Sequence, residues 1–178
     1  VVESILKKWK SNLMLIPFIS KVTLNIAVGA AQERLDKAAA LLEQLTGLKP
    51  SIRKAKKTIK NFGISKKQPI AVVVTLRGAK AYAFLRNVLT AVNNILKASS
   101  FDQWGNVAFG LREHLLLPGV RYDPNIGIFG MDIAVTIERK GYRVMRRRVE
   151  RSTIPKRHRT TKEEGILMME LLFGVKVV

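Results

Sequence analysis

The alternation of apolar and polar residues between positions 21 and 28 constrains the fold more than any other feature of this chain. The stretch reads KVTLNIAV, and a period of two residues is typical of a β-strand with one buried face. Residues 70–77, IAVVVTLR, show the same alternation. If helices cover the apolar face of these strands, the opposite face presents Thr23, Asn25, Thr75 and Arg77. An ordinary polar, solvated face is the alternative interpretation of those four residues.

Further segments with clear periodicity complete the predicted fold. Apolar residues at helical spacing and terminal glycines predict helices, while β-branched alternating runs predict strands. Thr161 and Glu164 form a T-x-x-E capping box that begins the last helix, which should end before Gly174. The predicted ranges are helices at 32–46, 79–98 and 161–173, and strands at 21–28, just after Pro50, at 70–77, 106–112 and 131–138.

The order of these elements shows no repeated βαβ rhythm, which favours the α+β class over a parallel sheet. We therefore expect a mostly antiparallel sheet with helices packed on one face, the other face open, and a long basic loop between the second and third strands. The 178 residues suit one domain over 1–178.

The net charge is the anomaly of the composition. The chain carries 32 Lys and Arg against 13 Asp and Glu, a net charge of +19, although 47% of its residues are apolar as in a globular protein. Repulsion of this size opposes a compact state, so a partner of opposite charge is expected. Nucleic acid is the first candidate, and an anionic membrane surface is the second.

The cations are concentrated in two clusters. The first lies at 53–69, RKAKKTIKNFGISKKQP, inside a span from Gln44 to Phe101 that contains no acid. The second runs from Arg139 to Arg159 with only Glu150 opposed, and its many arginines favour bidentate phosphate contacts. We expect the segment 139–160 to be extended and to bind phosphates through Arg143, Arg146, Arg147, Arg148, Arg151, Arg157 and Arg159.

The first cluster surrounds a small apolar group. Lysines that bind the sugar-phosphate backbone could flank a Phe62-Gly63-Ile64 tip that stacks against nucleotides. Alternatively, Ile59, Phe62 and Ile64 fold back together as a satellite core. The sequence leaves these two interpretations of the apolar side chains open.

Motifs for catalysis, metals and cofactors are not found. The chain has no Cys, and His114 and His158 are far apart, so neither disulfides nor a recognisable metal-ligand motif is expected. Phosphate-loop, dinucleotide-binding and nucleophile-elbow patterns are missing. Glu113 and His114 would point to opposite faces of a strand and make a poor acid–base pair. No apolar run is long enough to span a membrane. We expect no enzyme, no metal and no cofactor; a membrane-surface or polyanion-binding module and an RNA-modifying enzyme remain as alternatives.

Seven stretches resemble one protein family in the family's order. They are KVTLNIAVG, LTGLKP, AKKTIKNFGI, PIAVVVTLRG, SFDQWGNVAFGLREH, PGVRYDPNIGIFGMDIAVTIERKGYRV and STIPKRHRTTKEE. Together they resemble the universal 5S-rRNA-binding protein of the large ribosomal subunit, ribosomal protein L-five, named L-eleven in eukaryotes. The resemblance covers about 13–174 and is closer to the archaeal and eukaryotic branch. Leu48 and Ser65 depart from the family pattern, which usually has Gln and Arg at those places.

The resemblance implies a structural ribosomal protein of the central protuberance, located in the cytoplasm. Its open sheet face would bind 5S rRNA, with the family's contacting residues falling on Asn25, Thr75 and Arg77, three of the residues that alternation already places outward with Thr23. The other implied partners are large-subunit rRNA, neighbouring ribosomal proteins and the elbow of the P-site tRNA, with no membrane. The tRNA contact falls on the basic loop, at Lys56, Lys57, Lys60, Asn61, Phe62, Gly63, Lys66 and Lys67.

Overall fold

The computed structural model describes residues 2–29 and 32–178. Its centre is a five-stranded antiparallel sheet in the order β2-β3-β1-β6-β5. The strands are β1 (Phe18–Ala27), β2 (Ser51–Lys54), β3 (Pro69–Leu76), β5 (Val107–Leu111) and β6 (Met131–Glu138). The predicted α+β class and antiparallel sheet are therefore confirmed. Strand β6 covers the predicted range 131–138.

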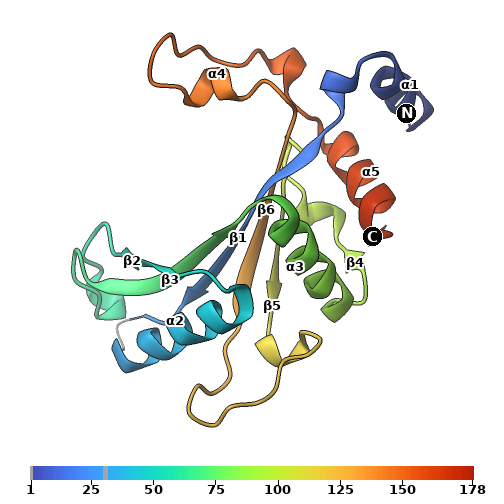
Figure 1. Cartoon of the computed structure of the whole chain (residues 1–178). Helices are drawn as coiled ribbons and strands as arrows, with labels where there is room; N and C mark the ends of the chain where they lie inside the picture. Colours follow the sequence, from blue (N-terminus) through green and yellow to red (C-terminus); the bar gives the residue numbers. More distant parts are fainter. Residues whose placement is uncertain (1, 30–31) are drawn as a thin grey trace.

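Three helices cover one face of this sheet, as expected. Helices α2 (Gln32–Thr46) and α3 (Gly78–Ala91) lie along it, and α5 (Lys162–Phe173) lies beside α3 (Figure 1). Their buried residues pack on the alternate apolar residues of the strands, among them Val22, Leu24 and Ile26 of β1 and Val72, Val74 and Leu76 of β3. Burial of these side chains supplies the main stabilisation of the fold.

The last helix begins and ends at the predicted residues. The Thr161 hydroxyl accepts a hydrogen bond from the Glu164 amide, and the Glu164 carboxylate accepts one from the Thr161 amide. Gly174 ends the helix with a left-handed φ of 65°, a conformation that glycine adopts at low cost. Close approach to the loop before β5 requires glycine at 165, because a Cβ there would lie 2.4 Å from the Gly105 carbonyl oxygen.

The helix predicted over 79–98 is wrong beyond Ala91. Helix α3 ends at Ala91, and Asn93 and Asn94 have φ values of 57° and 55°. The chain then forms β4 (Ile95–Leu96), which pairs in parallel with β7 (Lys176–Val177). Helical periodicity cannot show this, because the pairing partner lies 81 residues further along the chain.

Three more elements were not predicted. An N-terminal helix, α1 (Val2–Ser11), buries Ile5 and Trp9. Strand β7 is two residues long, and the short helix α4 (Arg143–Arg146) interrupts the segment 139–160, which we expected to be extended.

Candidate nucleic-acid interface

The face of the sheet opposite the helices is formed by small and polar residues. Rows across the strands follow the register: Thr75, Thr23, Ala134 and Ala108 form one row, and Val73, Asn25, Asp132 and Gly110 form the next. Thr75, Ala108, Gly110, Asp132 and Ala134 are exposed, and Thr23, Asn25 and Val73 are half-buried. Because few long side chains rise from this surface, we call it the open face.

Asn25 forms a hydrogen bond with an acid on the open face. Its Nδ2 donates a hydrogen bond of 3.2 Å to the Asp132 carboxylate on the neighbouring strand. Asp132 was not among the predicted site residues, although the alternation of residues 131–138 places it outward. One donor of the amide is therefore engaged, while its carbonyl oxygen has no hydrogen bond from the described part of the chain.

Arg77 occupies a different position from the other three predicted residues. It follows the last residue of β3 and serves as the N-cap residue of α3. Its exposed guanidinium donates a long hydrogen bond of 3.5 Å to the Ser20 carbonyl oxygen, so the charge lies beside β1 at the end of the open face. The structure thus brings Thr23, Asn25 and Thr75 onto one surface, with Arg77 at its border.

The first basic cluster forms a hydrogen-bonded hairpin between β2 and β3, which we call the basic hairpin (residues 55–68). Ala55 and Gln68 pair at its base, and the amide of each of Ile59 and Ile64 donates to the carbonyl oxygen of the other, at 2.8 and 3.2 Å. A 3-10 turn at Lys60–Phe62 forms the tip and ends at Gly63 with φ 63°. The predicted loop residues Lys56, Lys57, Lys60, Asn61, Phe62, Gly63, Lys66 and Lys67 are all exposed.

The apolar side chains of the hairpin do not form a closed core. Phe62 is 74% exposed and Ile59 is 46% exposed, although Ile64 is half-buried. The alternative in which all three fold back together is therefore not what the structure shows. An aromatic ring at the tip, surrounded by lysines, is suited to stacking on a nucleotide base.

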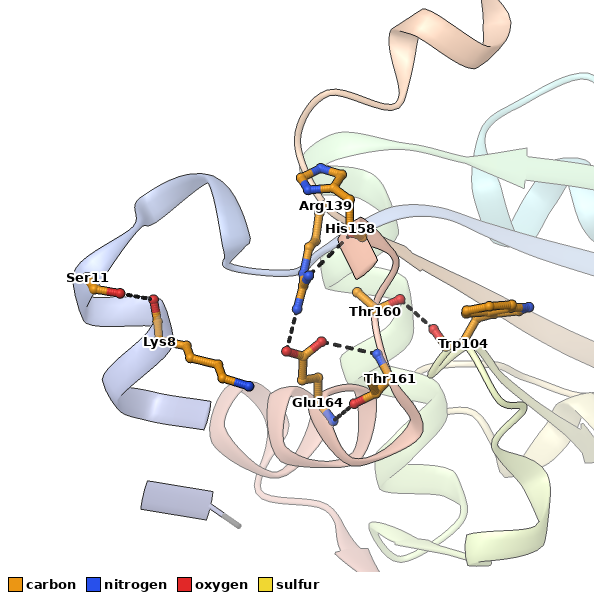
Figure 2. A network of polar contacts seen from close by, with 8 residues as sticks. All are labelled: Lys8, Ser11, Trp104, Arg139, His158, Thr160, Thr161 and Glu164. Carbon is orange, nitrogen blue, oxygen red and sulfur yellow. Dashed lines mark hydrogen bonds and ion pairs between the residues drawn. The ribbon is translucent and has the colours of Figure 1, made fainter. Parts of the chain in front are cut away.

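The second basic cluster is a loop whose two ends are fastened together (Figure 2). At its base, Arg139 forms an ion pair with the Glu164 carboxylate and donates a hydrogen bond of 3.3 Å to the His158 carbonyl oxygen. His158 Nε2 in turn lies 3.0 Å from the Lys140 carbonyl oxygen. We call the segment held in this way, residues 140–158, the basic loop.

Several cations of this cluster have intramolecular acidic partners, two of which, Glu138 and Glu164, lie outside the segment 139–159. Arg139 is buried with Glu164, and Arg146 pairs with the buried Glu138. Arg147 contacts Glu150, with a nitrogen–oxygen distance of 3.8 Å. Within the described residues, no ion pair is formed by the exposed Arg143, Arg148, Arg151 and Arg157. These four are the free phosphate-binding candidates of the cluster.

Arg159, the last predicted phosphate contact, lies over an aromatic ring. Its guanidinium carbon is 4.8 Å from the centroid of the Trp104 ring, and both side chains are half-buried. Tyr142 lies nearby in the basic loop, and burial raises the pKa of its hydroxyl above the ordinary value. These aromatic residues gave no recognisable sequence signal, because nothing in their local pattern connects them.

The two basic clusters flank the open face at its opposite ends. The basic hairpin extends β3 beyond the end where Ala71 pairs with Ala27, whereas the basic loop follows β6 beyond the end where Glu138 pairs with Phe18. Figure 1 shows both as projections from the sheet, apart from each other. An elongated polyanion that crosses the open face would reach cations at both ends.

Metal binding, acid–base catalysis and membrane spanning have little support in the described residues, 2–29 and 32–178. No group of three His, Asp or Glu side chains could hold a metal ion there. His114 is buried, and its Nδ1 accepts a hydrogen bond of 3.3 Å from the Phe129 amide. Glu113 is exposed, so Glu113 and His114 do not form an acid–base pair. None of the described helices has the length and hydropathy of a membrane span.

Comparison with known proteins agrees with this geometry. A family model described as "Ribosomal protein L5" matches residues 12–64, and the model of the same family's C-terminus matches residues 69–168. The large ribosomal subunit protein uL5 of Aeropyrum pernix is 54% identical over 99% of this chain and 93% of its own length. The uL5 proteins of Sulfurisphaera tokodaii and Sulfolobus acidocaldarius are 57% and 53% identical over 90% and 95% of the chain, and 91% and 95% of their own lengths.

These matches cover nearly the whole chain, and the relatives are named as ribosomal proteins and not as enzymes. The chain therefore belongs to the ribosomal protein L5 family.

Proposed function

We propose that this protein is a structural constituent of the large ribosomal subunit in the cytoplasm, acting as one domain over residues 1–178. Its open face binds 5S rRNA in the central protuberance, and its basic hairpin contacts the elbow of the P-site tRNA. The relatives of this family carry the name of the large subunit. The remaining rRNA and neighbouring ribosomal proteins are the other partners.

One observation carries the proposal for RNA binding: an open β-face with few long side chains lies between two basic clusters. The small residues allow an RNA backbone to approach the strands closely. Thr23, Asn25 and Thr75 can hydrogen-bond ribose and base edges, and Arg77 can bind a phosphate at the border. The exposed arginines of the basic loop extend the phosphate contacts.

The basic hairpin suits a second RNA contact because it projects away from the sheet (Figure 1). Its lysines have no acidic partner among the described residues, so a phosphate backbone would supply the missing counter-charge. Phe62 at the tip would then stack on, or pack against, an exposed nucleotide. The alternative of a membrane-surface module gains no support from α1, because its apolar residues Ile5 and Trp9 are already buried in the core.

The experiment compares two RNA contacts in one panel of variants. The double variant Asn25→Ala/Arg77→Ala should weaken 5S rRNA binding in filter binding by about 3 kcal/mol, roughly a hundredfold. The matched control Asn87→Ala/Arg86→Ala removes the same chemistry from exposed positions on α3, on the covered side of the sheet, and should leave the affinity unchanged. Equal affinities of the two double variants would contradict the assignment of the open face.

The same panel of variants distinguishes the RNA contact of the basic hairpin from that of the open face. Replacing Lys56, Lys57 and Lys60 by Ala should preserve 5S rRNA binding and reduce cross-linking of the hairpin to P-site tRNA in assembled ribosomes. Loss of 5S rRNA binding instead would show that the two surfaces are assigned wrongly. For the wild type, neutralisation of six to ten phosphates predicts that the 5S rRNA affinity falls roughly a thousandfold or more between 50 and 200 mM salt.

A further inference from the structure

A small pocket lies where the open face meets the basic loop. It has a volume of about 160 Å³, and its lining residues come from β6, the turn before β5 and the basic loop with its flanks, among them Trp104, Thr136, Tyr142, Met145, Ile154 and Arg159. The residues are brought together from four separate stretches of the chain, so no local motif predicts the pocket.

The pocket continues the open face. Thr136 faces the same side of β6 as Ala134, two residues or about 7 Å further along the strand. Its partner on β1 is Lys21, and the partner of Ala134 is Thr23. An RNA strand bound across Thr23 and Thr75 would therefore have this pocket within reach of its next nucleotides.

The aromatic wall of the pocket is held in place before any ligand arrives. The Thr160 hydroxyl donates a hydrogen bond of 2.5 Å to the Trp104 carbonyl oxygen (Figure 2), and the Arg159 guanidinium lies 4.8 Å from the ring centroid. The side chain of Asn106, another lining residue, is also held by hydrogen bonds. It accepts one of 2.9 Å from the Ile137 amide and donates one of 2.7 Å to the Asp102 carboxylate. A fixed ring loses little conformational entropy on binding.

The composition of the walls selects a planar, uncharged group attached to a phosphate chain. The Trp104 indole, one face of which is covered by the Arg159 guanidinium, offers a stacking surface, and Met145 and Ile154 offer apolar contacts. The lining carboxylate of Glu138 is paired with Arg146, and exposed arginines of the basic loop lie in the same segment. A nucleic-acid base has this shape, and unstacked bases bind aromatic rings and guanidinium planes in this way. The volume of about 160 Å³ is large enough to admit a base.

We propose that this pocket receives an unpaired base of the RNA bound on the open face, with Trp104 as its stacking partner. The inference rests on the proposed RNA-binding function and extends it by naming a base-binding subsite. Arg159 acts as a positioning residue on the indole ring, and Thr160 fixes the backbone that carries the ring. A base in the pocket would also fix the register of the RNA relative to the rows of the open face.

Fluorescence tests the proposal directly, because the chain has two tryptophans. Trp9 is buried in α1 with its indole nitrogen unpaired, so the variant Trp9→Phe is mild and leaves Trp104 as the reporter. Titration of Trp9→Phe with 5S rRNA should quench Trp104 in a saturable way, with the same midpoint as filter binding. A fully paired RNA duplex of equal length should bind without this quench.

Variants of the ring give the energetic test. Trp104→Ala should weaken 5S rRNA binding by roughly 5- to 100-fold, the range of one stacked base, and Trp104→Phe should recover most of the loss. Tyr122→Ala removes a ring that is 56% exposed in the loop before β6 and should have no effect. Circular dichroism of each variant checks that the fold is intact.

The outcomes separate this inference from the proposed function. If Trp9→Phe binds 5S rRNA with normal affinity while the Trp104 intensity stays constant, the base subsite is wrong and RNA binding by the open face stands. Equal quenching of Trp9 in the Trp104→Phe variant would also overturn it. Absence of 5S rRNA binding by the wild type would refute the proposed function itself.

Discussion

The buried contact between Glu164 and Arg139 gives the sharpest prediction about stability. Their side chains are 5% and 6% exposed, and Glu164 also completes the capping box of α5. Glu164→Ala would leave the Arg139 charge buried without its carboxylate, which costs about 3–5 kcal/mol. Loss of the hydrogen bond from the Thr161 amide to the Glu164 carboxylate adds about 1 kcal/mol. We expect the free energy of unfolding to fall by roughly 4–6 kcal/mol, a large part of the 5–15 kcal/mol typical of a domain.

Urea denaturation followed by circular dichroism measures this loss. With a slope of about 2 kcal/mol per molar urea, the midpoint should fall by roughly 2–3 M. Glu163→Ala is the matched control, since Glu163 is exposed in the same turn, and it should cost less than about 1 kcal/mol. The double variant Arg139→Met/Glu164→Leu should recover much of the stability, because it removes both charges. A Glu164→Ala midpoint within experimental error of Glu163→Ala would refute the reasoning.

Two further changes test the open face and the packing of α5. Asp132→Asn removes the acid on the open face and should tighten 5S rRNA binding up to about fivefold at low salt, with a smaller gain at high salt. The control Glu43→Gln changes an exposed acid on α2 and should leave the affinity unchanged. Equal effects of the two variants on the affinity would show that Asp132 does not face the RNA. Gly165→Ala places a Cβ 2.4 Å from the Gly105 carbonyl oxygen and should cost about 1–3 kcal/mol in thermal unfolding. Gly110→Ala should be tolerated, because the added Cβ would lie 3.8 Å from its nearest neighbour. A similar loss of stability in both variants would contradict the close packing of Gly165 against Gly105.

Most of the central fold could be predicted because its signals are local. Alternation places the strands and assigns their two faces, and the expected outward positions of Thr23, Asn25 and Thr75 agree with the register of β1 and β3. The T-x-x-E capping box fixed the start of α5. Such patterns depend on residues two to four positions apart, so they need no knowledge of the topology.

Prediction failed where a distant partner decides the conformation. Helix α3 ends early so that Ile95 and Leu96 can pair with Lys176 and Val177. Trp104 and Arg159 meet although they are 55 positions apart, and this contact creates the pocket at the edge of the open face. Neither the strand pair nor the pocket leaves a trace in local periodicity.

The sequence by itself determined the excess of positive charge, its two clusters and the alternation that leaves one face of a sheet with few large apolar residues. Only the tertiary structure decided which charges remain available. Arg139 is neutralised by Glu164, 25 positions away, and Asn25 is bonded to Asp132, 107 positions away. The physical reason is that charge is a property of each residue, whereas an ion pair requires two side chains to meet, and the folded chain alone decides which of them do.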